Sequence, residues 1–560
     1  PNGSFQSINR RYDIVYGDVM LNFNYNINRF DIAATVGWTG RYENMNNMRV
    51  STNGGLVTEN WFDLNASRYT PSSTLQRMEL LKTGYMGTLS LGWDNYLFLE
   101  LTGRQERSST LKDQSFFYPS ANLSFLFTQA FHMPSWWNYG KLRLSYGIVG
   151  NAPETYTANI VYEQGSDNGF TWNTIPSSWG NADIRPEKKY EYEIGLESKF
   201  LNNRLGIDVS YYNNRVKDQI LSTPQPSTSG VKNVLMNVGE VANHGWDISI
   251  SATPILTRDF RWDLTANYGV YKNKVVKLAD GVPYLEILNS GGSGIKIQAV
   301  EGQPMGDIYA QVPQVNENGE YLVSDKGLYL NQTELQKVGN INPAGVGGLF
   351  NSFSYKNVFL DFSIDFRIGG DVINEMNQYA TAVGLTPESL KYRDTEHGGL
   401  SYYYPGDNNS SGIPVQVDPS TGAGPNGEII YHDGIILPGV VASTGERNTR
   451  IIPAGYYYNT TYNWGTEAEQ LTYRHSVFDN SYVKLRELTI GYQFPEKIIS
   501  KLGLGRLSVS VFGRNLFYFY KALKNYDAES SVGTSWANQA TVGSSTTATR
   551  SFGVSLRASF

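Results

Sequence analysis

The sequence predicts an all-β fold, an antiparallel barrel whose strands cross a membrane. Three observations predict it: apolar and polar residues alternate strictly over many stretches, the polar parity carries repeated charges, and short connections alternate with long ones. A period of two residues is typical of a strand with one apolar and one polar face. Many stretches reach the roughly 9–11 residues that a tilted strand needs to cross a bilayer. Charges on the polar parity suit a wet lumen, with lipid on the other side.

The alternation is clearest in the last ten residues, SFGVSLRASF. Their apolar parity runs from Phe552 to Phe560, while serine, glycine and arginine fill the other parity. The stretch 357–369 repeats the pattern, with a row of leucine, phenylalanine and isoleucine opposite Asp361 and Arg367. Such stretches predict strands whose apolar parity faces lipid.

We count fifteen such strands in the sequence. They cover residues 12–27, 30–41, 83–93, 95–105, 119–129, 140–148, 189–200, 203–214, 243–252, 259–273, 345–355, 358–369, 481–494, 505–517 and 549–560. One strand is irregular, because the apolar parity of 481–494 slips at Arg486 and Glu487. This slip predicts a β-bulge.

The connections between these strands predict an orientation. The tight ones are 28–29, 94, 201–202, 253–258 and 356–357, with 130–139 and 495–504 slightly longer. The long ones are 42–82, 106–118, 149–188, 215–242, 274–344, 370–480 and 518–548. Short periplasmic turns and long extracellular loops are the layout of an outer-membrane barrel, and we expect the loops to lack secondary structure. Within 495–504, Pro495 and Gly503 predict the start and end of a short helix.

Fifteen is an odd number of strands. Both the first and the last strand run toward the periplasm, whereas a closed bacterial barrel has an even number of strands and both termini there. We therefore expect an odd number of strands before residue 1; the alternative is one miscounted strand. Residues 1–560 are then a single domain, the C-terminal part of a longer barrel.

The composition excludes several functions. A net charge of −6 over 560 residues leaves no electrostatic footprint for nucleic acid, and the absence of cysteine excludes disulfides and thiolate metal sites. The five histidines lack metal-ligand spacing, and no catalytic triad, phosphate loop or dinucleotide fingerprint can be argued, so we expect no enzyme and no cofactor. The oxygen-rich stretches 407–412 and 418–428 could bind Ca²⁺, but ordinary turns are the simpler interpretation.

Two segments carry a resemblance to a known family. In the first, the strand 481–494 is followed by a P-x-K…L-G turn and a strand ending G-x-N-L-F, which comprise Pro495, Lys497, Leu502, Gly503, Gly513, Asn515, Leu516 and Phe517. The second is an N-P…G-G…F-S-Y-K-N block, made of Asn342, Pro343, Gly347, Gly348, Phe353, Ser354, Tyr355, Lys356 and Asn357. Both segments resemble the C-terminal barrel of SusC/RagA-type TonB-dependent outer-membrane transporters of the Bacteroidetes.

The resemblance implies a set of expectations. Large transporters of this kind have 22 strands and a plugged lumen, so seven strands, the N-terminal plug and the TonB-contacting segment would precede this sequence. The implied location is the outer membrane, crossed many times. The implied function is active import of oligosaccharides or peptides. The implied partners are a SusD-like surface lipoprotein, the TonB complex, the outer-membrane lipid and the barrel-assembly machinery, which reads a terminal aromatic strand such as Phe552 to Phe560 as a sorting signal.

Loop aromatics are the candidate ligand-binding residues, because no bilayer explains them. Sugar rings present C–H faces that pack on aromatic side chains, which favours glycans over peptides here. The candidates are Trp172, Trp179, Tyr403, Tyr457 and Trp464 as stacking residues, with Arg261, Asp361 and Arg367 further along the lumen. The alternative for the loop aromatics is packing of loop on loop. Aromatics at the ends of strands, such as Trp93, Trp136, Trp137 and Trp246, are instead expected to form interfacial girdles.

Other functions remain alternatives at this point. A passive porin or channel would share the strand pattern but need no plug. A TonB-dependent siderophore or vitamin receptor would share the barrel but take another cargo. A soluble β-rich adhesin is the alternative from a different class, and it would leave the membrane without detergent.

Overall fold

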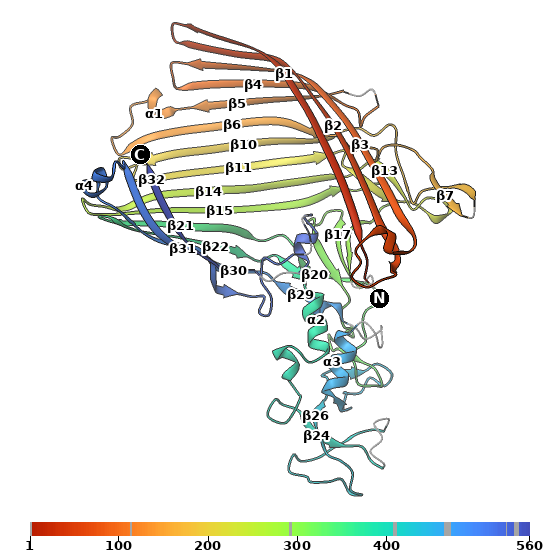
Figure 1. Ribbon diagram of the computed structural model, residues 1–560. Helices are drawn as coiled ribbons and strands as arrows, with labels where there is room; N and C mark the ends of the chain where they lie inside the picture. Colours follow the sequence, from red (N-terminus) through yellow and green to blue (C-terminus); the bar gives the residue numbers. More distant parts are fainter. Residues whose placement is uncertain are drawn as a thin grey trace. The chain divides into compact units, whose positions relative to one another are not determined.

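The computed structural model describes residues 3–112, 115–167, 169–290, 294–406, 412–463, 472–531, 533, 535–542 and 548–559. Within these residues, fifteen strands form one sheet in which each strand neighbours the next sheet strand along the chain (Figure 1). The fifteen predicted strands are thereby confirmed, and the second and third are much longer than predicted. No helix of the described chain is long and apolar enough to cross a membrane.

The bounds of the sheet strands lie within a few residues of those predicted, apart from those of the first three strands. They are β1 (Gln6–Ile27), β2 (Phe30–Leu56), β3 (Ser67–Trp93), β4 (Leu97–Ser108), β5 (Ser115–Phe125), β6 (Trp137–Asn151), β10 (Glu187–Phe200), β11 (Leu205–Lys217), β14 (Glu240–Leu256), β15 (Phe260–Lys277), β21 (Gly345–Tyr355), β22 (Val358–Ile368), β30 (Tyr482–Gln493), β31 (Arg506–Lys521) and β32 (Ser551–Ser559). The prediction of a strand to residue 129 is wrong at its end, since α1 (Phe127–Ala130) follows β5.

The predicted long loop 42–82 is wrong. β2 and β3 pair without a break from Phe30↔Trp93 to Ser51↔Ser72, and only residues 57–66 lie between the two strands. The apolar parity that passes through Tyr42 and Met48 is interrupted by asparagines. Backbone hydrogen bonds continue the ladder where side-chain alternation no longer reveals it.

The tight turns follow from left-handed backbone positions. In the two-residue hairpins 28–29 and 356–357, Asn28 and Lys356 have φ of 53° and 52°. Two-residue hairpins need positive φ to match the strand twist, and asparagine tolerates it. The turn at Lys356 is also fixed by a hydrogen bond to the neighbouring turn, because the amide of Lys356 donates to the carbonyl of Asp259 at 2.7 Å. These two predicted turns are confirmed.

Two predicted irregularities are also confirmed. The pairing of β22 with β30 shifts between Ser363 and Ile364, and Arg486 is the residue left out of the register. Beyond β30, α4 (Glu496–Ile499) and the 3₁₀ turn η6 (Ser500–Leu502) lie between Pro495 and Gly503. Gly503 ends this helix in the left-handed conformation, with φ of 69°.

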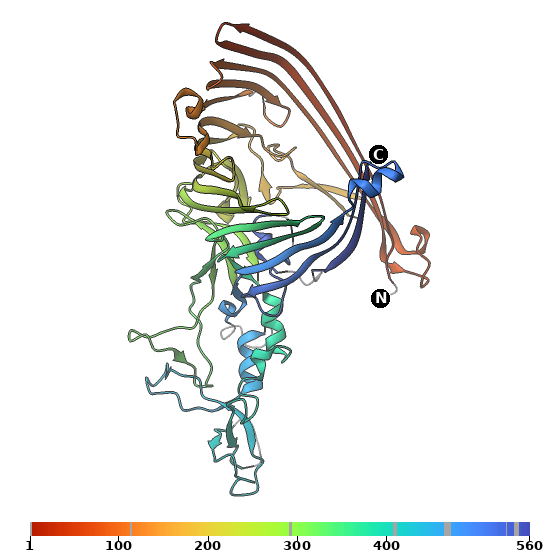
Figure 2. The same cartoon turned by 90° about the vertical axis from the view of Figure 1, so that its left-hand side faces the viewer.

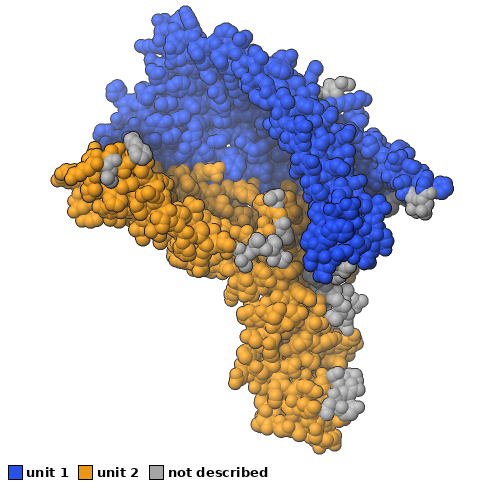
Figure 3. Space-filling model, viewed as in Figure 1, with its two compact units in different colours: residues 1–246, 273–282 blue, residues 247–272, 283–560 orange. Residues whose placement is uncertain are grey.

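The chain divides into two compact units, residues 1–246 with 273–282, and residues 247–272 with 283–560 (Figure 3). In the first, the connection 149–188 folds into the hairpin β7 (Glu163–Asp167) with β8 (Phe170–Thr174), and β9 (Ser178–Trp179) joins β12 (Ile220–Pro224) and β13 (Asn233–Asn237) in a small sheet. Leu111, Phe116 and Ile184 form a buried cluster in this unit. Whether residues 1–560 act as a single domain stays a prediction.

In the second unit the expectation of loops without secondary structure is wrong. The connection 274–344 includes a four-stranded sheet of β16 (Tyr284–Ser290), β17 (Ile295–Val300), β18 (Asp307–Ala310) and β20 (Gln336–Asn340). Ile295, Ile297 and Ile308 are fully buried in its core. These strands are short, and their apolar residues have no long alternation by which a sequence pattern could mark them.

The connection 370–480 forms a second structured region, and we call residues 374–406 and 412–463 the loop lobe. It contains α2 (Glu375–Ala382), η4 (Pro387–Leu390), β24 (Leu400–Tyr403), β25 (Val415–Gln416), β26 (Tyr431–Ile435), β27 (Val440–Val441), β28 (Ile452–Pro453) and α3 (Ala454–Tyr462). Before and after it lie β23 (Asp371–Ile373), which pairs with β29 (Val477–Asp479), and η5 (Tyr473–Ser476). α2 and α3 lie side by side in both ribbon views (Figures 1 and 2). Leu328, Ile435, Leu437 and Ile452 form a buried cluster at the lobe.

Candidate transport surface

The polar parity of the first unit is lined by ion pairs that cross strands. Arg143 on β6 reaches over β10 to Asp208 on β11, with Nη2 to Oδ1 at 2.7 Å and Nη1 to Oδ2 at 3.2 Å. The residue between them on β10 is Gly195, and a Cβ there would lie 2.8 Å from the guanidinium. A glycine at this position therefore lets the forked Arg–carboxylate pair form.

Further charges pair along single strands. Residues i and i+2 of a strand share one face. Arg41 with Glu43 at 2.6 Å, Arg104 with Glu106 at 2.9 Å, and Arg261 with Asp263 at 2.6 Å are pairs of this kind. The polar parity is therefore densely charged, and several of its charges pair with one another.

The side chains of the opposite parity are apolar and exposed. In β32 the side chains of Phe552, Val554 and Leu556 are about 70% exposed (73%, 71% and 68%). Contiguous exposed apolar surface of this kind marks a region that another apolar phase covers. Phe560 lies outside the described residues.

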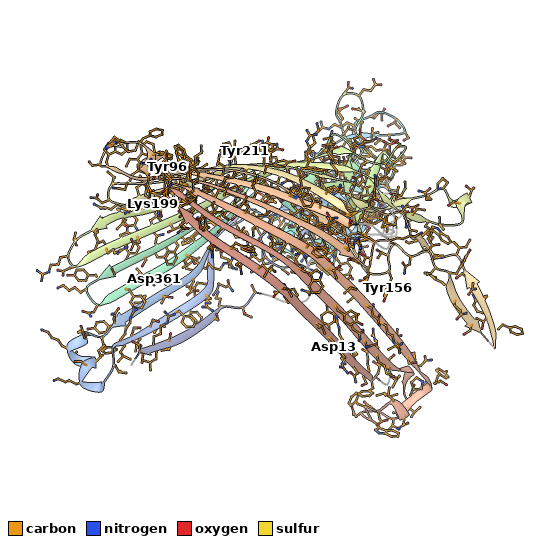
Figure 4. All side chains as sticks on the ribbon, turned by 90° about the horizontal axis from the view of Figure 1, so that it is seen from above. Asp13, Tyr96, Tyr156, Lys199, Tyr211 and Asp361 are labelled. Atoms are coloured by element: carbon orange, nitrogen blue, oxygen red, sulfur yellow. The ribbon has the colours of Figure 1, made fainter. Side chains whose placement is uncertain are left out.

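An aromatic row marks the short-turn end of the first unit. Phe30 stacks on Trp93 at 6.4 Å, and Trp93 contacts Tyr96 at 5.4 Å. The row goes on through Trp136, which stacks on Trp137 and on Phe200 at 6.0 Å in each case. Figure 4 shows Tyr96 and Lys199 at this same end of the sheet. Such a row fits an interfacial girdle.

Trp246 lies apart from this row. It sits within β14, where its ring packs on Tyr211 at 4.9 Å.

Each unit has a cavity along its polar parity. The cavity of the first unit is about 800 Å³ and is lined by polar groups that include Asn24, Glu100, Asn122 and Arg143. The cavity of the second unit is about 540 Å³; its lining is polar and charged and includes Asp361, Glu487, Thr489, Arg506, Ser508 and Arg557. Both cavities are lined by the ends of strands, the first near the turn 28–29 and the second near the turn 356–357. Polar groups of a ligand would meet hydrogen-bond donors and acceptors in either cavity.

The three predicted lumen residues lie in different surroundings. Asp361 lines the cavity of the second unit and has no hydrogen-bond or ion-pair partner in the described chain (Figure 4). Arg261 is exposed and paired with Asp263. Arg367 donates to the carbonyls of Ile341 at 3.0 Å and Gly369 at 3.2 Å, so its guanidinium holds a turn.

Two of the predicted stacking residues lie in the first unit. Trp172 on β8 pairs with Gly165 of β7, and a Cβ on that glycine would lie 2.6 Å from the indole. The indole therefore covers the glycine, yet Trp172 is still 46% exposed. Trp179 on β9 contacts Tyr162 edge to face at 5.8 Å.

The others lie in the loop lobe. Tyr403 on β24 is partly exposed and pairs with Val415. Tyr457 on α3 contacts Tyr458 at 5.1 Å and packs against the buried cluster of the lobe, and its burial raises the pKa of its hydroxyl. Trp464 lies outside the described residues. No observation tests these five as ligand contacts, and they stay predictions.

Sequence reasoning missed one cluster of charges. Arg486, left out of the ladder by the bulge, bonds to Asp365 at 2.6 Å and to Glu529 at 2.5 Å and 2.9 Å. Lys484, whose side chain is only 2% exposed, reaches the same carboxylate at 2.5 Å. The parity slip at Arg486 was the available signal, since a bulge re-aims a side chain.

The described residues include no group of three or more histidine, cysteine or acidic side chains that could hold a metal ion. Of the stretches considered for Ca²⁺, 407–412 lies almost entirely outside the described residues. In 418–428 the carboxylates bond to their own turns: Asp418 accepts from the amide of Ser420 at 2.9 Å, and Glu428 from the amide of Asn426 at 2.8 Å. The amide of Asn426 holds the pKa of Glu428 at about 2.

The family of the chain follows from a match to a family model. Residues 1–313 match the TonB dependent receptor-like, beta-barrel family. The chain belongs to this family. The predicted fold class is thereby confirmed: this is a TonB-dependent receptor β-barrel, and it is a multi-pass protein of the outer membrane. Its polar parity faces the lumen, and its exposed apolar parity faces the lipid.

Relatives and solved structures agree with this family. TonB-dependent receptor P3 of Formosa agariphila is 24% identical over 494 residues, which are 80% of this chain and 42% of that protein. TonB-dependent receptor SusC of Bacteroides thetaiotaomicron is 30% identical over 247 residues, 40% of this chain and 24% of that protein. The structure of the RagAB peptide transporter superposes with a TM-score of 0.67 at 18% identity, covering 93% of this chain and 54% of that chain, and shows the shared fold. The TonB-dependent receptor β-barrel described here thus spans about half, or less, of the length of these proteins.

Proposed function

We propose that this barrel is part of an active, TonB-dependent importer of oligosaccharides that works with a SusD-like surface lipoprotein. The observation that carries the proposal is the charged, self-paired lumen side of a chain that belongs to the TonB-dependent receptor family. Because Arg143 and its neighbours pair with acids inside the wall, the lumen offers many hydrogen bonds but little net charge. A neutral polyhydroxylated ligand can exchange hydrogen bonds along such a wall without being trapped.

The loop aromatics support a glycan ligand over a peptide. The exposed indole of Trp172 offers a flat face for the C–H side of a sugar ring, and Trp179 with Tyr162 adds an aromatic pair in the same connection. A peptide would use its backbone amides and need fewer flat surfaces. Tyr457 contributes less to this argument, since it packs inside the loop lobe.

The loop lobe supports a docking partner. α2 and the residues after it expose a group of large apolar side chains, which are Met376, Tyr379, Val383, Leu385 and Leu390. An exposed apolar group of this size, outside the membrane-spanning strands, fits an interface with another protein. The partner that the SusC/RagA resemblance implies is a surface lipoprotein, with energy supplied through TonB.

Calorimetry on the full-length transporter with its lipoprotein tests the proposal. We expect at least one neutral oligosaccharide of a panel to bind, and a pool of random tripeptides to pentapeptides to give no heat. Binding of the peptides with failure of every glycan would overturn the oligosaccharide class. Uptake that persists in cells lacking TonB would overturn active import and favour a passive channel.

A further inference from the structure

The loop lobe has a cavity of its own, away from the strands of the barrel. Its volume is about 580 Å³, within the range of small-molecule sites. Three separate segments form it: the end of α2 with the residues after it (381–393), the start of β26 (430–433), and α3 (454–459). α2 and α3 pack on each other, and Tyr458 on α3 donates a hydrogen bond to the carbonyl of Glu388 at 2.8 Å (Figure 1). The walls are therefore tied together before any ligand arrives.

Several polar groups that line this cavity keep at least one polar atom unpaired in the described chain. The side-chain amide of Asn459 makes no hydrogen bond there. His432 uses only Nδ1, against the hydroxyl of Ser401 at 2.8 Å, which leaves Nε2 available. Asp433 uses one carboxylate oxygen, which accepts from the hydroxyl of Tyr402 at 3.1 Å. Polar groups that converge on a cavity with unpaired donor or acceptor atoms are the feature that gives a ligand site its specificity.

Arg393 adds a cation to this set. Only its Nη2 makes hydrogen bonds, at 3.4 Å to the carbonyl of Gly384 and 3.5 Å to the hydroxyl of Ser389. It forms no ion pair in the described chain, and the neighbouring Asp394 is held by His397 at 2.7 Å. Nη1 and Nε of Arg393 are therefore open to an anion, and a guanidinium matches the fork of a carboxylate.

We propose that this cavity binds an oligosaccharide that carries a carboxylate, with the carboxylate on Arg393 and the sugar hydroxyls on Asn459, His432 and Asp433. The site sits in the loop lobe and makes acidic glycans the preferred class of ligand. This inference rests on the proposed import of oligosaccharides. Ile430, Tyr431 and Ala454 supply apolar lining for the C–H faces of the sugar rings.

The test uses the full-length transporter–lipoprotein complex and two matched probes, trigalacturonic acid and its uncharged counterpart galactotriose. Binding is measured by calorimetry at low and high salt. We expect the wild type to bind the acid at least roughly tenfold more tightly, as a charge-assisted fork predicts, with the preference reduced by salt. Arg393→Ala removes the preference and Arg393→Lys retains part of it, since a lysine keeps the charge but not the fork.

Arg447→Ala is the matched control, because Arg447 is exposed in the same lobe but does not line the cavity. We expect it to leave both affinities unchanged. Equal binding of the two probes by the wild type, or an unchanged preference in Arg393→Ala, overturns the acidic site while leaving neutral glycan import intact. Failure of both probes and of every other glycan, with binding of peptides, overturns the proposed function and this inference together. Limited proteolysis of each variant should give the same fragment pattern as the wild type. A lost preference then reflects the site and not the fold of the lobe.

Discussion

Arg486 holds Glu529 in a two-pronged ion pair, with Nη2 to Oε1 at 2.5 Å and Nη1 to Oε2 at 2.9 Å. The arginine is the bulged residue of β30 and the glutamate belongs to the connection before β32. The same connection is tied to the loop lobe, because Asn525 donates to Asn377 of α2 at 3.0 Å. The connection before β32 thus links the barrel wall, through Glu529, to the lobe, through Asn525.

Removing that carboxylate is expected to destabilise the protein. Glu529→Ala leaves Lys484 buried with its charge unpaired, which costs about 3 kcal/mol, the lower end of the range for a broken buried pair, because Glu529 itself is one-third exposed. Refolding into detergent or lipid, followed by urea unfolding, measures the loss. Glu446→Ala, at an exposed glutamate with no ion pair in the described chain, is the control and should stay near zero. A loss no larger than that of the control would show that the cluster does not bear on stability.

The same pair gives a pH dependence. Burial by itself raises the pKa of Glu529, but the hydrogen bonds from Arg486 and Lys484 outweigh it and lower the pKa to about 2. A depressed carboxylate pKa contributes stability that is fully present above the ordinary value near 4.5 and is lost as pH falls toward 2. We expect the protection of residues 522–531 against hydrogen exchange, taken relative to the intrinsic exchange rate at each pH, to hold down to about pH 5 and to fall below it. In Glu529→Gln the protection should be low throughout; a wild-type profile in that variant would contradict the assignment.

The two faces of β22 are expected to differ in tolerance. Ile364→Arg places a charge on the lipid side near the middle of the strand, at a cost of about 2–4 kcal/mol, whereas Asp361→Asn on the lumen side should change little because Asp361 has no partner in the described chain. Asp365 is not a suitable lumen control, since it bonds to Arg486. Refolding yield and unfolding free energy in lipid compare the two variants. Equal losses would mean that the faces are assigned wrongly.

Gly195 tests the ion pair that crosses β10. Gly195→Val puts a branched side chain where the guanidinium of Arg143 lies, so the fork to Asp208 must open, at a cost of about 1.5–3 kcal/mol for hydrogen bonds to charged groups. The control is Gly17→Val in β1, where an added Cβ meets nothing within 4 Å. Unfolding in lipid measures both. If Gly17→Val lowers the unfolding free energy as much as Gly195→Val, the loss comes from replacing a strand glycine and not from opening the Arg143–Asp208 pair.

The strands could be predicted because a bilayer imposes a simple rule on them. One parity must be apolar over a whole crossing, so even the parity slip at Arg486 marked a real bulge. The rule ends where the bilayer ends. In the outer parts of β2 and β3 beyond Tyr42, polar residues interrupt the apolar parity, and backbone hydrogen bonds continue the pairing.

The sites could not be predicted in the same way. Arg393, His432 and Asn459 come together only because α2, β26 and α3 pack against each other, and no spacing in the sequence records that. The sequence shows that the loops are rich in aromatic residues. It does not show which of these rings pack inside the loops and which are exposed. Tyr457 faces a buried cluster, whereas Trp172 keeps 46% of its surface in solvent.

If Trp172 stacks on sugar, Trp172→Ala weakens binding of the best oligosaccharide by roughly tenfold, the usual scale for truncating a tryptophan at the centre of a contact. The control is Trp61→Ala, at another half-exposed tryptophan, in the connection between β2 and β3. Calorimetry on the full-length complex compares them, with thermal unfolding to show that the β7–β8 hairpin survives the loss of the indole over Gly165. Unchanged affinity in Trp172→Ala would mean that the indole only covers the glycine. Equal weakening in both variants would mean that the loops respond to any lost tryptophan, and the stacking role would then have no support.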